Sequence, residues 1–206
     1  HHLLRRQRQM CIRDSKHILL TSENQYDLKK IMSEINIPCI VKPNNGGSSI
    51  GVSKVNHIND LENKIKIAFK ECNEVLIEDF LFGKEVSVGV IQKKDKRIIL
   101  PVTEIISENE LFDYEAKYLG QSTEITPANI SNEEKNLIQK YINIIYDNIE
   151  FNGFTRSEFI IVDGIPHILE TNTIPGFTKQ SIIPQQIEAH GLSVKDEINY
   201  QIESIL

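Results

Sequence analysis

Hydrophobic residues recur along this chain at two spacings, and each spacing predicts a different kind of element. Apolar residues three and four positions apart are typical of amphipathic helices. They predict helices over residues 23–35, 58–72, 131–149 and 182–191. The third of these begins at Ser131 and carries Glu134 three residues later, which is the signature of a capping box.

Shorter apolar runs bounded by turn residues predict strands. They occupy residues 38–43, 52–55, 74–81, 84–92 and 97–106, and a hairpin follows in "RSEFIIVDGIPHILETNTIPGFT", residues 156–178. Because strands and helices mix without strict β-α-β alternation, we predict an α+β fold with mainly antiparallel sheets. Residues 108–128 show little periodicity and several aromatic side chains, so we interpret them as a candidate lid over a functional site.

Composition argues against several classes of protein. Apolar residues make up 40% and charged residues 25% of the 206 residues, as in ordinary globular proteins. No run approaches the roughly 18 apolar residues of a membrane helix, so we expect no membrane partner. The net charge of −6 argues against a nucleic-acid-binding protein. Cys11, Cys39 and Cys72 are scattered without a CxxC spacing, which fits buried thiols in a reducing cytosol and a cytoplasmic protein.

The first fifteen residues, "HHLLRRQRQMCIRDS", differ from the rest of the chain. They hold four of the six arginines and no lysine, whereas the chain from Lys16 onward has seventeen lysines and only two arginines, Arg97 and Arg156. We therefore interpret residues 1–15 as a non-native or disordered leader. A basic targeting peptide is the alternative, although the segment lacks an apolar core and a small-residue cleavage site.

The loop "NNGGSSIG", residues 44–51, is the first candidate for ligand binding. Its glycines let backbone N–H groups approach an anion, and Ser48 and Ser49 add hydroxyl donors. Lys42, in the strand before the loop, can bring a positive charge to a phosphate. The loop lacks the Gly-Lys-Ser/Thr ending of a Walker loop, and a strand follows it, so it is not a dinucleotide fingerprint. A flexible hairpin turn explains the glycines equally well.

Two glutamates, Glu78 and Glu85, stand at the ends of successive strands in "LIEDFLFGKEVSV". The backbone between them could read the edge of an adenine base, and a carboxylate could bind ribose hydroxyls. On these residues alone, the preferred interpretation is a pair of solvated acids at strand ends.

The open end of the hairpin carries the strongest signal. Arg156 and Glu158 lie on its first strand, and Glu170 and Asn172 lie on its second. Side chains alternate between the two faces of a strand, so these four share a face only in one register. A two-residue Asp-Gly turn would send the acids to opposite faces. A three-residue loop, residues 162–164, with a glycine bulge would bring all four together, and we predict this loop.

Two carboxylates on one face need a positive partner. Oxygen ligands from Glu158, Glu170 and Asn172 suit Mg²⁺ or Mn²⁺, particularly where substrate phosphates complete the coordination. Arg156 is suited to bidentate contact with an oxyanion. A surface salt bridge between Arg156 and Glu170 is the alternative, but it leaves Glu158 and Asn172 unexplained.

Four motifs in order, "VKPNNGGSSIGVSKV", "FDYEAKY", "RSEF" and "LETNTIPGFTKQSIIP", resemble those of the D-alanine–D-alanine ligases of the ATP-grasp superfamily. The resemblance runs from about Lys16 to the C-terminus. It implies an ATP-grasp fold, in which two α+β subdomains, residues 16–84 and 85–206, hold ATP between them. It also implies a fragment, since such ligases begin with a further α/β domain that serves the first D-alanine and a homodimer contact.

The resemblance assigns roles residue by residue. ATP would be bound by Lys42, Ser48, Ser49, Glu78, Asp79, Phe80, Leu81, Glu85 and Lys117. Two Mg²⁺ or Mn²⁺ ions would be held by Glu158, Glu170 and Asn172, the first of which is often Asp in relatives. Catalysis would involve Arg156, Ser48, Tyr118, Lys117 and Gly176, and substrate would contact Ser181 and Tyr114. For Lys117 and Tyr118, an amphipathic surface strand is the alternative.

The implied activity is ATP-dependent ligation of two D-alanines to D-alanyl-D-alanine for peptidoglycan precursor synthesis. ATP phosphorylates the carboxylate of the first D-alanine, and the amine of the second attacks the resulting D-alanyl phosphate. Tyr118 favours D-alanine over D-lactate as the second substrate by the same resemblance. Two alternatives stay open: an ATP-grasp carboxylate–amine ligase with another substrate, and a fragment that binds Mg-ATP without catalysis.

Overall fold

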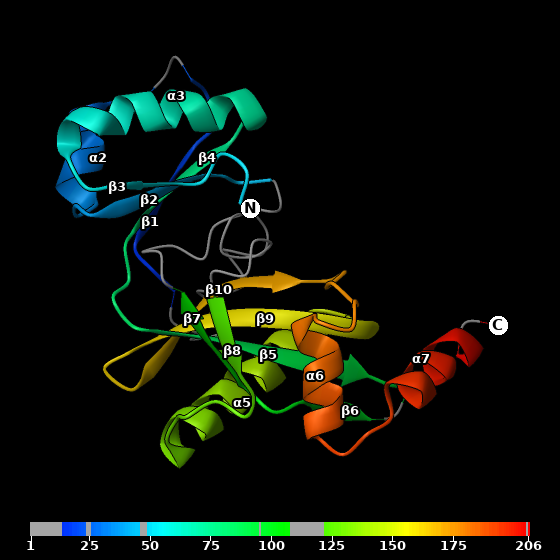
Figure 1. Cartoon of the computed structure of the whole chain (residues 1–206). Helices are drawn as coiled ribbons and strands as arrows, with labels where there is room; N and C mark the ends of the chain where they lie inside the picture. The colour runs from blue at the N-terminus through cyan, green and yellow to red at the C-terminus, as the bar shows by residue number, and fades with distance from the viewer. Residues whose placement is uncertain (1–13, 24–25, 46–48, 95, 108–121, 205) are drawn as a thin grey trace. The chain divides into compact units, whose positions relative to one another are not determined.

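The computed structural model describes residues 14–23, 26–45, 49–94, 96–107, 122–204 and 206. The chain divides into two compact units, each with its own sheet (Figure 1). Among the described residues, unit 1 holds Asp14, 82–106 and 123–206, and unit 2 holds 15–81 with 107 and 122. Within the described part of the chain, no helix is long and apolar enough to cross a membrane.

Unit 2 is a four-stranded sheet with helices packed on it. The strand order is β1 (His17–Leu20), β4 (Val75–Asp79), β2 (Cys39–Pro43) and β3 (Ser53–Val55), and each neighbouring pair is antiparallel. The helices are α2 (Leu28–Glu34), the 3₁₀ helix η1 (Ile58–Asp60) and α3 (Leu61–Glu71). Asp27 caps α2 by accepting a hydrogen bond from the Lys29 N–H. Leu61, Ile65 and Ala68 form the buried side of α3 and join the core formed with β2 and β4.

Unit 1 is built on a larger sheet. Its strand order is β10 (Ile165–Asn172), β9 (Gly153–Val162), β5 (Lys84–Gln92), β7 (Thr103–Ser107) and β8 (Ser122–Ile125), with β6 (Arg97–Ile99) also paired to β5. The helices are α5 (Asn132–Asn148), α6 (Ile182–Ala189) and α7 (Val194–Glu203). The predicted capping box of α5 is present, because the Ser131 side chain accepts from the Glu134 N–H and the Glu134 carboxylate accepts from the Ser131 N–H.

Alternation along β5 sends its side chains to two different helices. The valines of β5 belong to the core cluster that contains the buried side of α5. Ile91 belongs to another cluster with Ile183 and Ile187 of α6. The central strand of this sheet is therefore covered by α5 on one face and by α6 on the other.

The predicted α+β fold with mainly antiparallel sheets is confirmed, with local differences. β1 and α7 were not predicted, and β8 lies inside the segment predicted as a lid, of which residues 108–121 fall outside the described residues. The single strand predicted over 97–106 is two strands, β6 and β7. Pro101 lies between them, and proline has no N–H group for a strand ladder.

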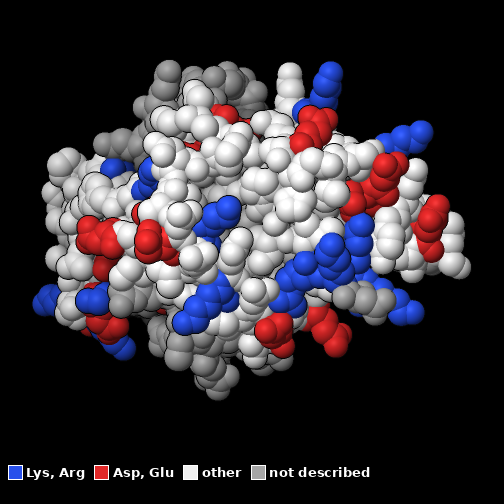
Figure 2. Space-filling view, turned by 90° about the horizontal axis from the view of Figure 1, so that it is seen from below, with Lys and Arg blue, Asp and Glu red and all other residues white. Residues whose placement is uncertain are grey.

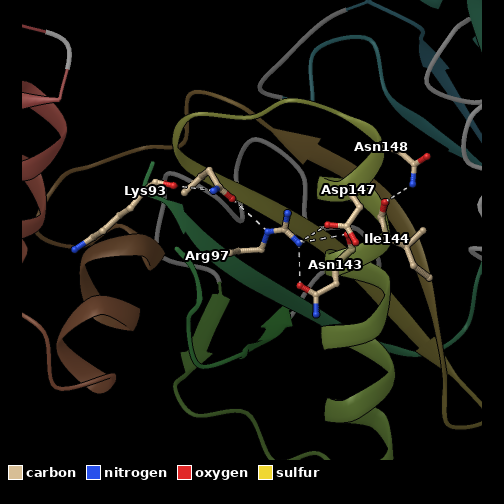
Figure 3. Close-up of polar contacts among 7 residues, drawn as sticks. Lys93, Arg97, Asn143, Ile144, Asp147 and Asn148 are labelled. Carbon is tan, nitrogen blue, oxygen red and sulfur yellow. Dashed lines mark hydrogen bonds and ion pairs between the residues drawn. The ribbon is translucent and has the colours of Figure 1, made fainter. Parts of the chain in front are cut away.

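Arg97 ties β6 to α5 in unit 1 (Figure 3). Its guanidinium donates to Asn143 Oδ1 at 3.0 Å, to Asp147 Oδ1 at 3.1 Å and to Gln92 Oε1 at 3.3 Å. It also lies over the Tyr146 ring, 4.9 Å from the ring centroid, and burial raises the pKa of the Tyr146 hydroxyl. One of the two arginines in the lysine-rich part of the chain thus has a structural role that needs a planar, multivalent donor.

Basic and acidic side chains are intermingled on the face of the molecule shown in Figure 2. Lysine and arginine (blue) lie beside aspartate and glutamate (red) in that view. This distribution accords with the modest net charge of −6.

We expect Arg97→Lys to lower the free energy of unfolding by about 1 kcal/mol, because an ammonium group cannot bond Asn143 and Gln92 together and stack on the Tyr146 ring. Asp147→Asn is the matched control, since 68% of the Asp147 side chain is exposed and an exposed ion pair contributes about 0–1 kcal/mol. Urea denaturation followed by circular dichroism measures both. Equal effects of the two substitutions would contradict this role for Arg97.

Candidate functional site

A buried ion pair joins two strands of unit 2. Lys42 Nζ lies 2.5 Å from Glu78 Oε1, and Ser15 Oγ donates to Glu78 Oε2 at 2.8 Å. The register of β2 against β4 pairs Lys42 with Leu76 and Ile40 with Glu78, so Lys42 and Glu78 are diagonal neighbours on one face. Glu78 is only 9% exposed. The solvated-acid interpretation preferred for Glu78 is therefore wrong, because both of its oxygens are bonded within the protein.

Two of the three backbone N–H groups from Asp79 to Leu81 are bonded within unit 2. The Asp79 N–H donates to the Lys16 carbonyl, and the Phe80 N–H donates to the Pro38 carbonyl. Within the described residues, the Leu81 N–H has no hydrogen-bond partner. Leu81 is the residue of this segment whose N–H can meet a ligand.

The glycine-rich loop is described only at its two ends. Ser49 and Gly51 have positive φ angles of 58° and 75°, so the chain turns sharply where it leaves the loop. A Cβ at Gly51 would come within 2.9 Å of both Pro43 and Glu71 side-chain carbons, which explains the glycine there. The candidate donor Ser48 lies outside the described residues.

The hairpin turn differs from the one we predicted. Val162 pairs with Ile165, so Asp163 and Gly164 form a two-residue turn, and their φ angles of 49° and 77° identify the mirror-image turn that asparagine-glycine and aspartate-glycine pairs favour. The predicted three-residue loop over 162–164 is wrong. The two-residue turn requires a positive φ at Asp163, and aspartate adopts a positive φ more readily than most residues, so no third loop residue is needed.

The shared face is nevertheless present, because the second strand contains a bulge. The register pairs Ile168 with Phe159 and then Glu170 with Glu158, which leaves Leu169 as the extra residue. Beyond it Asn172 pairs with Arg156. The predicted convergence of the four polar residues on one face is confirmed, although the turn is not its cause.

Within this group, Arg156 compensates the charge of Glu158. Arg156 Nη2 donates to Glu158 Oε1 at 2.7 Å, and Glu158 is 4% exposed. The guanidinium Nε of Arg156 is buried and has no hydrogen-bond partner among the described residues. Arg156 thus has a buried partner within β9, whether or not it also pairs with Glu170.

The donor set fits a hard divalent cation. Glu158 and Glu170 offer carboxylate oxygens, and Asn172 adds an amide oxygen that accepts a hydrogen bond from the Ile174 N–H at 3.0 Å. Oxygen donors of this kind suit Mg²⁺ and Mn²⁺, which often complete their shell with substrate phosphates. In the described part of the chain, no group of three His, Cys, Asp or Glu side chains could hold a metal unaided.

Ser181 is the residue before α6, and its side chain turns back toward the preceding turn. Ser181 Oγ accepts from the Thr178 N–H at 3.0 Å and lies 2.9 Å from Thr178 Oγ1. A Cβ on Gly176 would lie 3.2 Å from Ser181 Oγ, so Gly176 and Ser181 are neighbours. Ser181 does not cap α6 with its side chain. Its hydroxyl instead lies beside Gly176 and bonds Thr178.

Sequence reasoning missed Glu124, a half-buried carboxylate on β8. Gln185 of α6 donates to Glu124 Oε2 at 3.2 Å and also to the Gln180 carbonyl at 2.9 Å. Burial raises the pKa of Glu124, while the Gln185 hydrogen bond and the charge of Arg156 act in the opposite direction. No periodicity surrounds Glu124, so the sequence offered no signal that it faces Arg156.

Of the other predicted residues, Glu85 is the second residue of β5, where it is half-buried and pairs with Ile105 and Ile160. Tyr114, Lys117 and Tyr118 lie outside the described residues, and their roles stay predictions.

Comparison with known proteins identifies close relatives. The family model described as D-ala D-ala ligase C-terminus matches residues 9–203. Proteins named D-alanine–D-alanine ligase from Flavobacterium johnsoniae and Christiangramia forsetii are 49% and 47% identical to this chain over 184 and 195 residues. The alignments cover 89% and 95% of this chain, which spans 57% and 60% of those relatives' lengths.

Solved structures show the same fold. The VanG D-Ala:D-Ser ligase from Enterococcus faecalis superposes with a TM-score of 0.85 at 30% identity, over 98% of this chain and 60% of that one. The D-alanine–D-alanine ligase from Bacillus anthracis complexed with ATP gives a TM-score of 0.79 at 25% identity, over 98% of this chain and 63% of that one. The predicted ATP-grasp fold is confirmed by these likenesses.

The raised pKa of Glu124 predicts a pH-dependent stability. A carboxyl group whose pKa is raised by folding stabilises the fold below its ordinary value of 4.5, and this contribution is lost as pH rises through the folded pKa. Glu124→Gln removes that loss. We therefore expect Glu124→Gln to have a higher free energy of unfolding than the unsubstituted chain, and we expect this difference to grow as pH rises from below 4.5 toward neutrality.

Urea titrations at a series of pH values measure this difference. Glu188→Gln, at an exposed position of α6, is the control and should give a smaller change with pH. A difference between Glu124→Gln and the unsubstituted chain that stays constant with pH would show that Glu124 is not destabilised by burial.

Proposed function

The chain belongs to the D-alanine–D-alanine ligase family, and from this premise we propose that it carries the ATP- and metal-binding part of an enzyme that joins two D-alanines. The reaction passes through a D-alanyl phosphate and yields the dipeptide of peptidoglycan precursors. The observation that carries the proposal is the bulge at Leu169, which sets Glu170 and Asn172 opposite Glu158 and Arg156 on one face. A matched family model over residues 9–203 supports it.

Unit 2 supplies the groups that bind the nucleotide in this proposal. Lys42 contacts the phosphates, and the loop with Ser48 and Ser49 closes over them. The available N–H of Leu81 and the carboxylate of Glu78 meet the adenine. Because Lys42 and Glu78 are already paired at 2.5 Å, the same two side chains are held ready on one face of the sheet.

Glu158, Glu170 and Asn172 of unit 1 would hold two Mg²⁺ or Mn²⁺ ions, which would neutralise charge on the transferring phosphoryl group. Arg156 stabilises the oxyanion that forms when the acceptor amine attacks the acyl phosphate carbon. Its buried Nε has a donor to offer, since no described residue accepts from it.

The turn before α6 receives the acceptor amino acid. Ser181 Oγ, next to Gly176, donates to the acceptor carboxylate, and the backbone at Gly176 faces the reacting carbonyl. Lys117, Tyr118 and Tyr114 would close over the site and exclude water from the acyl phosphate. D-alanine is the proposed acceptor; the similarity to a D-Ala:D-Ser ligase makes D-serine the competing acceptor to test.

The setting of the reaction follows from the family resemblance. We place it in the cytoplasm, where ATP is made available. For the full-length protein we carry over a homodimer as a proposal. Residues 16–84 and 85–206 are the proposed subdomains. The proposed leader, residues 1–15, overlaps the family model, which begins at residue 9, and its last residue, Ser15, is buried and bonds Glu78.

Phosphate release from Mg-ATP tests the function directly. We expect release that depends on D-alanine and exceeds release with D-serine or L-alanine. Arg156→Lys should lower the rate about 100-fold, because one oxyanion donor contributes roughly 10²–10³ in rate. Arg97→Lys is the matched control, since Arg97 contacts only structural partners among the described residues.

A folded chain that binds Mg-ATP but releases no phosphate with D-alanine would support the alternative of a nucleotide-binding module. Release stimulated equally by other amino acids would instead support a ligase of different substrate.

The metal proposal has its own test. Glu170→Gln should raise the Mg²⁺ concentration for half-maximal rate by at least about tenfold. Loss of a residue that merely orients a metal ligand already weakens metal binding by about 10–100-fold, and loss of a ligand should cost at least as much. Mn²⁺ binding in the presence of ATP, followed by its paramagnetic resonance, gives a readout besides activity. Glu188→Gln is the control. Unchanged Mn²⁺ affinity in Glu170→Gln would remove Glu170 from the site.

A further inference from the structure

α6 carries one fully buried polar side chain, Gln186, with an exposed fraction of 0%. Its amide makes three hydrogen bonds of 2.9 Å: Oε1 accepts from the Gly89 N–H, and Nε2 donates to the Ser87 carbonyl and to Thr103 Oγ1. A buried amide that is satisfied at both ends fixes the helix that carries it, because any shift leaves buried polar groups unpaired.

These bonds fill a break in the ladder of β5. Ser87 is the last β5 residue paired with β7, and Val90 is the first paired with β6. Between them the Gly89 carbonyl accepts from the Leu100 N–H, and its N–H is left for Gln186. The Gln186 amide therefore takes the place of a peptide group from a neighbouring strand.

The two β5 residues held by Gln186 are the cross-strand partners of the candidate site. Ser87 pairs with Glu158, and Gly89 pairs with Arg156. Gly89 has to be glycine, since a Cβ there would come within 2.5 Å of Gln186 Oε1. Side chains that are paired in register point to the same face, so α6 docks beside Arg156 and Glu158.

The other end of the same helix begins after Ser181. Since α6 is a rigid element of eight residues, holding it at Gln186 also holds Ser181 relative to the sheet. A positioning residue at Gln186 thus links the proposed acceptor-binding hydroxyl to the proposed oxyanion donor, Arg156.

We propose that Gln186 is the positioning residue that sets Ser181 against Arg156 and Glu158, and that it thereby determines affinity for the acceptor amino acid. The functional part of this inference rests on the proposed ligase activity. Gln186 itself touches neither substrate nor nucleotide.

The test substitution is Gln186→Met, which preserves length but leaves the Gly89 N–H and the Ser87 carbonyl unpaired. We expect the KM for acceptor D-alanine to rise about tenfold, the effect of one misplaced hydrogen bond, whereas the KM for ATP changes less than about twofold. Ile187→Ala is the matched control, because it removes a buried side chain from the same helix without touching these bonds.

A second readout does not depend on turnover. Amide hydrogen exchange in Gln186→Met should accelerate about tenfold at Gly89, Thr178 and Ser181 beyond the change seen in Ile187→Ala, because the Gly89 amide donates to Gln186 itself and the other two amides bond within the turn that leads into α6. If Gln186→Met does not fold, Gln186→Glu replaces it at a pH where the carboxyl group is ionised, since the carboxylate keeps the acceptor for the Gly89 N–H but has no hydrogen for the Ser87 carbonyl.

The outcomes separate the two proposals. If the unsubstituted chain shows no D-alanine-dependent phosphate release, the proposed function fails, and hydrogen exchange still decides the role of Gln186. Gln186 would be an ordinary core residue if exchange at Thr178 and Ser181 were unchanged in Gln186→Met. The same would follow if Gln186→Met and Ile187→Ala raised the KM for D-alanine and the KM for ATP by equal factors.

Discussion

Glu158 is a carboxylate that is 4% exposed, and the arrangement of unit 1 around it follows from the need to keep that charge paired. An isolated buried carboxylate would be so costly that it would take up a proton instead. Arg156, two residues earlier on the same strand and hence on the same face, provides the partner at 2.7 Å. Removing one member of such a pair typically costs about 3–5 kcal/mol. A one-residue slip of β9 is also disfavoured, because it would carry both side chains to the apolar face of the sheet.

The neighbouring strands accommodate this pair in different ways. β5 places Ser87 and Gly89, its smallest side chains, opposite Glu158 and Arg156, and its valines on the other face toward α5. The small side chains leave room for α6, whose Gln186 bonds the buried β5 backbone between the parts paired with β7 and with β6. β10 instead inserts Leu169 as a bulge, which brings Glu170 onto the same face. One face of the sheet is thus polar beside α6, and the opposite face is an apolar core.

Local signals in the sequence predicted most elements, since caps, turn residues and apolar periodicity act over a few residues. The Ser131 capping box is of this kind, and so is the position of the hairpin at Asp163–Gly164, although the length of its turn was predicted wrongly. The convergence of the four hairpin residues was also predictable, but for a reason that was wrong, because Leu169 carries no sign that it will bulge. Bulges, like the burial of Gln186 and the position of Glu124, depend on which distant strand or helix lies alongside. A glutamine in an amphipathic helix has no distinguishing pattern until its partners, Ser87 and Gly89, are known.

Unit 2 also contains a buried carboxylate, Glu78, and its charge is paired with Lys42. Glu78 is buried and bonded by Lys42 and Ser15, so its charge is compensated inside the unit. A phosphate that approaches Lys42 has to share its ammonium group with Glu78, whereas an amine that approaches Glu78 has to share its carboxylate with Lys42. A ligand that brings both groups at once leaves neither side chain unpaired, and a ligand that brings only one of them leaves a buried charge exposed to its penalty. In the proposed function a nucleotide brings both groups, a phosphate for Lys42 and the amino group of adenine for Glu78, and the pairing of these two side chains would favour it over a simple phosphate.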